Sequence, residues 1–366
     1  MSLQYTLPRK YFASETVFQN EIERIFHERW ICVGRAEKIA KPGDYFIQTI
    51  GVENIIIVRD NEGQPRAFYN TCRHRGTLLC DQETGHFRKT IQCPYHAWTY
   101  ALDGRLIGVP DEHEMGFDKA DFPLHQAAVA TWEGFLFLNL ADEPESFTKF
   151  IAPLAAQVGD WHMGSLQMAD RIEYEVQANW KLIAENYNEC YHCPLIHPEL
   201  NQKSHYRSGN DKIDKGVILG GYQTITAAET LSLSGETCAP PLGDVAGDDL
   251  SRVYYYTIFP NLLLSLHPDY VMFHTLWPLA VDRTLVVCEW LFAPVALAQP
   301  EVDPQNAVKF WDMTNRQDWR ACELSQRGVQ SKAYVPGPFY DWQEHLLAEF
   351  DRQVLKALGE EPMVVG

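Results

Sequence analysis

Hydrophobic and polar positions repeat in two different ways along the 366-residue chain. From residue 14 to residue 30, apolar side chains recur at helical spacing, which predicts an amphipathic helix with Thr16 and Gln19 as a capping box. From residue 43 to about residue 139, short apolar runs are separated by turn signals such as Asp103-Gly104. Such closely spaced short strands predict a small sandwich or barrel. The strands are expected at 45–50, 54–59, 65–70, 90–92, 98–102 and 134–140.

Beyond residue 142, strands and helices alternate in blocks rather than as regular βαβ units, which favours an α+β domain over a dinucleotide-binding fold. The segment 230–249 is rich in Ser, Gly, Pro and Asp, and we expect a mobile loop there, either a lid or a disordered surface excursion. The strands are expected at 171–176, 252–258, 270–278 and 284–292, and the helices at 180–191, 304–326 and 342–358.

Composition narrows the range of partners. The chain is 46% hydrophobic and 22% charged, with 31 Lys and Arg against 49 Asp and Glu, for a formal charge of −18. This charge disfavours nucleic acid and acidic membrane surfaces, and it suits a cationic or neutral ligand. Neither a signal peptide nor an apolar run of about 20 residues is present, so a cytoplasmic location is expected. In a reducing compartment, the nine cysteines are expected to bind metal, react or pack.

Two short Cys/His pairs lie inside the β-rich region. Cys72 and His74 form a C-x-H pair, and Cys93 and His96 form a C-x-x-H pair. Zinc accepts such a donor set, but zinc ligands are usually spaced as a Cys pair followed by a His pair. One Cys and one His from each half suit a two-iron cluster in which the Cys pair binds one iron and the His pair binds the other.

A second set of candidate ligands follows residue 179. On a helix, Glu185, Glu189 and His192 would share one face, and Pro194 would end the helix so that His197 folds back. Two histidines and one carboxylate form the facial triad of non-haem iron oxygenases. Spacing does not select the carboxylate, because a distant Asp can also fold into the site.

Cys190 and Cys193 lie within the same stretch as a C-x-x-C motif. This motif is found in redox dithiols, and in many zinc sites it supplies two of the four ligands. Two cysteines that simply pack as small hydrophobic side chains remain the alternative.

The C-x-H and C-x-x-H pairs, together with Arg75-Gly76 and Trp98, resemble the Rieske [2Fe–2S] motif, with a slightly long interval that residues 81–86 account for. The block E-N-Y-x-E-C-Y-H-C-P-x-x-H-P, which begins at Glu185, is similar to the mononuclear-iron motif of Rieske-type ring-hydroxylating oxygenase alpha subunits. This resemblance implies that His192 and His197 bind iron.

The third iron ligand implied by the resemblance is Asp318, which follows Gln317 and precedes a Q-R-G segment; Asp312 is the second choice. The resemblance also implies that Glu189 connects the cluster of one subunit to the iron of its neighbour. Many members of the family have Asp at this position. The Glu of this chain resembles the subgroup of the family that acts on carnitine, choline and glycine betaine. Asn186 matches the pocket amide that touches dioxygen or substrate in the family, although a helix-surface amide is an equal alternative.

For the fold, the resemblance implies an α+β chain in three parts. Residues 1–40 are expected to form an N-terminal helical brace on the catalytic domain, and residues 41–142 an all-β Rieske [2Fe–2S] domain. Residues 143–366 are expected to form a catalytic domain of helix-grip (START-like) type, with a curved antiparallel sheet and mononuclear iron.

The function implied is that of a terminal oxygenase component with a Rieske [2Fe–2S] cluster and mononuclear Fe(II). The chain lacks the G-x-G-x-x-G fingerprint of nicotinamide binding, so electrons are expected from an NAD(P)H-dependent flavin and iron–sulfur reductase, with or without a ferredoxin. The resemblance further implies a head-to-tail homotrimer.

A small quaternary ammonium substrate is expected, hydroxylated or oxidatively N-demethylated with O2. Its cation would need aromatic faces. Of three consecutive tyrosines on one strand, either the middle one or its two neighbours can face the pocket. The aromatic candidates are Tyr254, Tyr255, Tyr256, Tyr270, Phe273, Trp277, Trp290, Trp311 and Trp319. An aromatic-ring dioxygenase is the alternative, and a non-catalytic Rieske electron carrier or zinc-binding protein is the alternative of another class.

Overall fold

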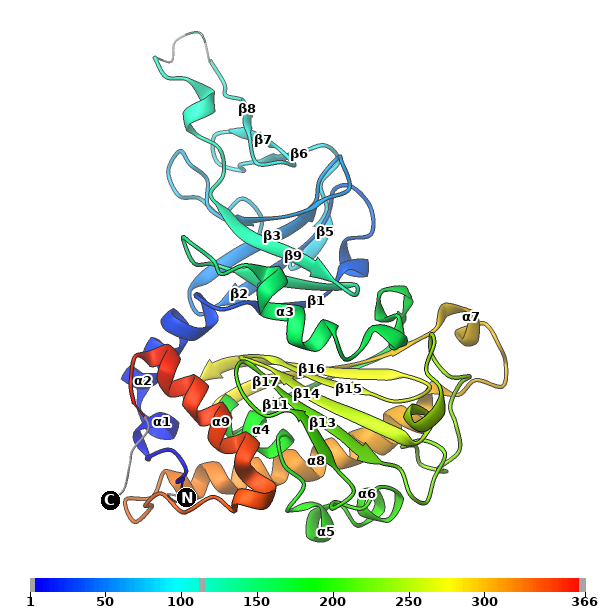
Figure 1. Ribbon diagram of the computed structural model, residues 1–366. Helices are drawn as coiled ribbons and strands as arrows, with labels where there is room; N and C mark the ends of the chain where they lie inside the picture. Colours follow the sequence, from blue (N-terminus) through cyan, green and yellow to red (C-terminus); the bar gives the residue numbers. More distant parts are fainter. Residues whose placement is uncertain (1–3, 112, 114–115, 362–366) are drawn as a thin grey trace. The chain divides into compact units, whose positions relative to one another are not determined.

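The computed structural model describes residues 4–111, 113 and 116–361 (Figure 1). The chain divides into two compact units. One unit is Phe26–Glu145, and the other joins Met1–Ile25 to Ser146–Gly366. Within the described residues, no helix has the length and apolar character needed to cross a membrane.

The Phe26–Glu145 unit consists mainly of antiparallel strands, as the short alternating runs predict. Its larger sheet has seven strands, and a second sheet has three. Buried Phe68, Tyr100 and Leu102 lie in its core. In spatial order, the larger sheet comprises β1 (Ile31–Arg35), β10 (Phe135–Asn139), β9 (Gln126–Trp132), β4 (Pro65–Tyr69), β3 (Glu53–Arg59), β2 (Asp44–Ile50) and β5 (Thr84–His86). The smaller sheet comprises β6 (Thr90–Gln92), β7 (Thr99–Ala101) and β8 (Leu106–Gly108).

The second unit is built on one antiparallel sheet of seven strands with helices against it, so the fold is α+β as expected. Strands β14 to β17 are almost wholly buried, because both of their faces are covered. In spatial order, the strands are β11 (Gln167–Val176), β17 (Arg283–Phe292), β16 (Val271–Ala280), β15 (Leu262–Leu266), β14 (Arg252–Ile258), β13 (Ile218–Thr224) and β12 (Asn210–Ile213).

Helices α4 and α8 lie along one face of this sheet (Figure 1). Helix α8 begins after Asp303, whose side chain accepts a hydrogen bond from the amide of Gln305, and Pro304 occupies the first turn. Its apolar side chains, including Phe310 and Trp311, face the sheet. The helices are α1 (Lys10–Ala13), α2 (Glu15–Glu21), α3 (Phe147–Ala155), α4 (Trp180–Tyr187), α5 (Cys193–Ile196), α6 (Pro198–Lys203), α7 (Pro294–Leu297), α8 (Pro304–Val329) and α9 (Asp341–Leu358).

Several local predictions were wrong. The N-terminal helix is capped by Ser14, whose side chain accepts from the amide of Val17, so Thr16 and Gln19 form no capping box. The helix expected at 180–191 ends at Tyr187, and Pro194 occupies the first turn of α5 instead of ending a helix. Strands β1, β5, β8, β9, β12, β13 and β15 were not predicted.

The segment 230–249 is a packed loop and not a surface excursion. The hydroxyl of Thr230 and the amide of Cys238 both donate to the buried carboxylate of Asp269, at 2.7 Å each. Leu231 and Leu242 are buried within the loop. Two hydrogen bonds to one buried carboxylate, together with these apolar contacts, fix the loop against the sheet.

Candidate metal centres and substrate cavity

His192, His197 and Asp318 meet at one point in the second unit. His192 precedes α5, His197 lies between α5 and α6, and Asp318 projects from α8. Nε2 of His197 lies 2.7 Å from Oδ1 of Asp318, and Nε2 of His192 lies 3.3 Å from the same oxygen. Each residue offers a ligand atom within 4.8 Å of the others. Two imidazole nitrogens and one carboxylate oxygen at this spacing fit the facial triad of a mononuclear iron site.

The opposite nitrogen of each imidazole is also held. His192 Nδ1 donates to Oε1 of Glu189 at 2.6 Å, and His197 Nδ1 donates to Oε1 of Gln317 at 2.7 Å. These bonds fix the tautomers that direct both Nε2 lone pairs toward a metal. Sequence reasoning assigned no role to Gln317. Its position directly before Asp318 was the signal that could have identified it.

Mutual electrostatics keep this group charged. Burial disfavours the imidazolium of His192, but the carboxylates of Asp318 and Glu189 outweigh it and raise the pKa of His192 to about 10. Burial also disfavours the charged form of Asp318, yet His192 and His197 lower the pKa of Asp318 to about 2. A protonated imidazole has no free Nε2 lone pair, so a metal ion bound here would replace the proton of His192 beside the carboxylate of Asp318.

The other candidate carboxylates lie elsewhere. Asp312 accepts from the hydroxyl of Tyr174 at 2.8 Å and pairs with Arg316. Glu185 is buried on α4, where the charge of Lys181 acts on it. Among the described residues, neither carboxylate belongs to a group of metal-binding side chains.

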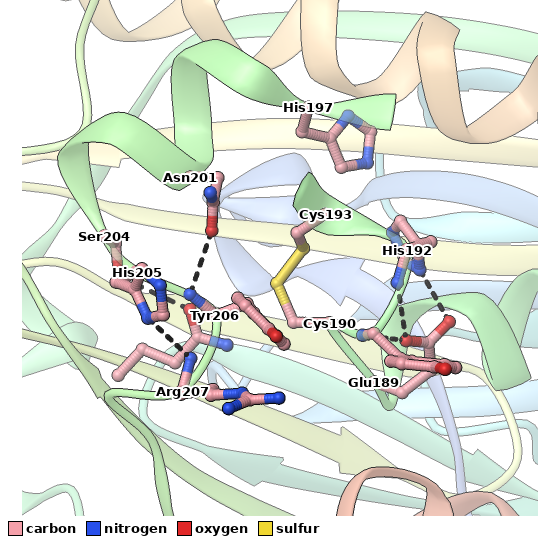
Figure 2. Close-up of a disulfide and its surroundings, with 12 residues drawn as sticks. Glu189, Cys190, His192, Cys193, His197, Asn201, Ser204, His205, Tyr206 and Arg207 are labelled. Carbon is pink, nitrogen blue, oxygen red and sulfur yellow. Dashed lines mark hydrogen bonds and ion pairs between the residues drawn. A yellow bond between two sulfur atoms is a disulfide. The ribbon is translucent and has the colours of Figure 1, made fainter. Parts of the chain in front are cut away.

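Cys190 and Cys193 form a disulfide within this segment. Figure 2 shows the bridge between the turn that carries Glu189 and the start of α5, with His192 beside it. The C-x-x-C motif is thus in the oxidised form of a dithiol. The bridge closes the short loop that contains His192, and Glu189 directly precedes this loop.

The cluster candidates in the first unit differ in exposure in a way that fits a Rieske centre. The Cys72 and Cys93 side chains are buried, whereas His74 is exposed and His96 is partly exposed. The two imidazole rings lie 4.8 Å apart, between centroids, and the ring of Trp98 stacks on His74. A cluster held here would have its thiolate-bound iron inside and its imidazole-bound iron at the surface.

The thiol of Cys72 contacts the hydroxyl of Tyr100 at 3.4 Å, and the same hydroxyl accepts from the amide of Arg73. Burial raises the pKa of the Cys72 thiol. Because a ligating thiol is deprotonated, metal binding would offset this preference for the protonated form.

A cavity of about 350 Å³ adjoins the His192, His197 and Asp318 group, which lines part of it together with Asn186. Of the three consecutive tyrosines on β14, Tyr255 lines the cavity, while Tyr254 and Tyr256 stack together elsewhere. Trp311 and Trp319 also line it, whereas Tyr270, Phe273, Trp277 and Trp290 are core residues. The aromatic lining comprises Tyr187, Tyr206, Tyr222, Tyr255, Trp311, Trp319 and Trp342.

Two family profiles match the chain. The profile "Ring hydroxylating alpha subunit (catalytic domain)" matches residues 163–360, and the profile "Rieske [2Fe-2S] domain" matches residues 29–132. The chain therefore belongs to the family of Rieske-type ring-hydroxylating oxygenase alpha subunits, and it is an oxidoreductase of the non-haem iron oxygenase class. Its cofactors are a Rieske [2Fe–2S] cluster and mononuclear iron, which the two donor sets fit.

Individual relatives place the chain within this family. It is similar to the glycine betaine monooxygenase oxygenase subunit of Pseudomonas aeruginosa, with 31% identity over 98% of this chain and 91% of the relative. Among solved structures, the chain is similar to the quaternary ammonium Rieske monooxygenase CntA, at 26% identity and a TM-score of 0.81, over 97% of this chain and 95% of that one. A further similar structure, that of a quaternary ammonium Rieske monooxygenase studied for carnitine oxidation and inter-subunit electron transfer, has 26% identity and a TM-score of 0.82 over 97% of this chain and 95% of that one.

Naphthalene 1,2-dioxygenase from Rhodococcus sp. shares the fold, with 22% identity and a TM-score of 0.79 over 98% of this chain and 95% of that one. An alpha subunit of this family is one component of a larger system. It works with a separate reductase and assembles into oligomers.

Proposed function

We propose that this chain hydroxylates or oxidatively N-demethylates a small quaternary ammonium compound, using O2 and electrons from a separate reductase. The aromatic lining of the cavity beside His192, His197 and Asp318 carries this proposal. A cation within about 6 Å of an aromatic ring gains roughly 0.5–2 kcal/mol. The formal charge of −18 and the similarity to glycine betaine and carnitine monooxygenases favour the same class of substrate.

The residue assignments follow the geometry. We assign His192, His197 and Asp318 as iron ligands, with Glu189 and Gln317 as the residues that orient the two imidazoles. When bound, the cluster and the iron supply electron transfer and dioxygen activation. We assign the cluster to Cys72, His74, Cys93 and His96.

Two further side chains have proposed roles. Glu189 holds the Nδ1 proton of His192, and we assign it the contact with His96 of the partner subunit. Asn186, half-buried in the wall of the cavity, is the amide that we assign to dioxygen or substrate. The aromatic rings exclude water around the substrate cation and hold a C–H bond toward the metal ligands.

Around the chain, we propose an NAD(P)H-dependent flavin and iron–sulfur reductase, with or without a ferredoxin, and a homotrimer in the cytoplasm. We keep the division into an N-terminal brace, a Rieske domain and a catalytic domain, but we move the first boundary from residue 40 to residue 25, because β1 pairs with β10 in the sheet of the Phe26–Glu145 unit. Sequence similarity to oxygenase subunits supports the separate reductase.

A single-turnover experiment tests the proposal without an identified reductase. The anaerobically reduced holoenzyme is mixed with O2 and one substrate, and products are measured by mass spectrometry. Hydroxylation of an N-methyl group would release formaldehyde and a tertiary amine, whereas hydroxylation of a chain carbon next to nitrogen would release trimethylamine. Product from glycine betaine, carnitine or γ-butyrobetaine is expected. Turnover of aromatic hydrocarbons with none of these three would favour a ring dioxygenase instead.

Two substitutions on one helix provide a matched control. Asp318→Ala is expected to abolish product and to lower iron from about three to about two per chain, while the two labile sulfides remain. Asp312→Ala, on the same helix, should retain all three irons because its carboxylate bonds to Tyr174 instead. Equal loss of iron in both variants would contradict the assignment of Asp318 as an iron ligand.

A further inference from the structure

The charges that line the cavity are unequal. Glu189, Asp211 and Asp318 contribute carboxylates. Among the described residues, Arg207 is the one Arg in the lining, and the lining contains no Lys. Arg207 follows α6 and precedes β12, and its side chain is exposed. It therefore places one positive charge on the solvent-accessible part of a cavity whose other side chains suit a cation.

Arg207 is held by stacking and not by a carboxylate. Its guanidinium carbon lies 5.1 Å from the ring centroid of Tyr206 and 5.0 Å from that of Trp342. Its backbone amide donates to His205 Nδ1 at 3.2 Å, which fixes the turn that carries it (Figure 2). Across the described residues, no salt bridge to Arg207 is found. A guanidinium that stacks on aromatic rings keeps its N–H donors available, because they point outward in the plane of the group.

Arg252 provides the contrast within the same unit. Its guanidinium carbon lies 4.3 Å from the ring centroid of Tyr222, but Asp248 and Asp249 pair with it at 2.9 and 3.3 Å. Its charge is thereby neutralised within the protein. Arg207 has the same kind of aromatic support without the two acids, so its capacity to bind an anion is retained.

We propose that Arg207 binds the carboxylate of a zwitterionic substrate and so selects quaternary ammonium compounds that carry a carboxylate. This inference rests on the proposed function and deepens it. Guanidinium and carboxylate match as a bidentate, charge-assisted pair, while the aromatic rings deeper in the cavity hold the ammonium group. Apart from the group of metal-ligand candidates, Arg207 is the one guanidinium or ammonium in the lining among the described residues, so it determines whether the carboxylate of a zwitterion is held.

The test compares Arg207→Gln, which removes the charge, with Arg207→Lys, which keeps it. Dissociation constants are measured by calorimetry on the anaerobic holoenzyme, together with kcat/KM, for glycine betaine, carnitine, γ-butyrobetaine and choline. Choline is the matched ligand because it has the trimethylammonium group without the carboxylate. For Arg207→Gln, the carboxylate-bearing compound that binds best is expected to weaken by about tenfold, while choline changes less than about twofold. Arg207→Lys should recover part of the loss.

Arg252→Gln is the control, because it removes a second ring-stacked arginine whose charge is already paired. It should leave the ratio of zwitterion to choline binding unchanged. Equal weakening of choline and the zwitterions by Arg207→Gln would reveal a structural role and overturn the proposal, as would no change in either. If the wild-type holoenzyme binds none of the four compounds, the proposed function fails, and the inference fails with it.

Discussion

At the residue scale, two hydrogen bonds determine which nitrogen of each imidazole points toward Asp318. Glu189 accepts from Nδ1 of His192, and Gln317 accepts from Nδ1 of His197, so both Nε2 atoms point toward the same carboxylate oxygen. The two partners differ in kind, because Glu189 carries a charge and lies on the turn after α4, while Gln317 is neutral and lies on α8. Orientation by Gln317 can therefore be separated from any role in electron transfer.

Substitution of Gln317 is expected to weaken iron binding selectively. In Gln317→Leu, Nδ1 of His197 loses its acceptor, and the ring is free to rotate or change tautomer. Loss of such an outer partner typically costs 10–100-fold in metal affinity. Iron dissociation measured by competition with a chelator should show a loss of about this size, with sulfide content unchanged. Gln157→Leu, at an exposed position, is the control; equal affinity in both variants would show that Gln317 has no positioning role.

The same residues show which parts of the candidate site could be predicted from the sequence. His192 and His197 were selected from local spacing, and their short connection keeps them near one another in almost any fold. Asp318 required a family resemblance, since spacing carries no information about which distant carboxylate folds in. The role of Gln317 depends on the direction of one side chain, and only coordinates provide that direction.

At the element scale, α4 is joined to its neighbours by buried charges. Lys181 on α4 pairs with Glu21 of α2 at 2.6 Å, with both side chains fully buried. Glu185, one turn along α4, lies buried near Asp351 of α9. Burial and repulsion from Glu185 raise the pKa of Asp351 well above its usual range, and burial raises the pKa of Glu185 to about 7. The helix that leads into Glu189 and His192 therefore depends on a carboxyl that is partly protonated near neutral pH.

This arrangement predicts a pH-dependent stability. An unfolded Glu has a pKa of about 4.3, so below that value both states are protonated and the stabilisation is fully present. As the pH rises toward 7, Glu185 loses its proton in the unfolded chain before it does so in the folded protein. The free energy of unfolding therefore falls by on the order of 1–3 kcal/mol. Glu185→Gln removes the contribution of Glu185, so the melting temperature of the variant minus that of wild type should increase between pH 5 and pH 8, although buried Asp351 keeps its own contribution. The exposed Glu199→Gln is the control; a parallel shift in both variants would contradict the assignment.

Element boundaries show where sequence patterns lose their information. Long periodic segments such as α8 were predicted closely, whereas β5 and β8 have three residues each and offer no full period to detect. The composition of the 230–249 segment indicated mobility, yet the buried Asp269 on another segment anchors it. For Tyr255, strand alternation correctly left two choices, and only packing against Trp311 and Tyr187 selects between them.

At the scale of the whole molecule, the two donor sets lie in different units. The cluster candidates belong to the Phe26–Glu145 unit, and the iron candidates to the unit that contains Ser146–Gly366. Alpha subunits of this family oligomerise, and the proposed homotrimer lets the cluster of one chain serve the iron of the next. A heterologous interface closes into such a ring when its rotation is threefold.

Mixed oligomers test this arrangement directly. His74→Ala should lack a functional cluster, and His192→Ala should lack functional iron, so each variant is expected to be inactive by itself. When the two are co-expressed and assemble at random, a cluster-competent chain precedes an iron-competent chain at about one quarter of the sites, and about that fraction of wild-type turnover should return. Transfer within a single chain would give none. Co-expression of His192→Ala with Asp318→Ala is the matched control: both lack iron, so the family-type trimer predicts no recovery there, whereas recovery would point to reconstitution of the iron site across chains.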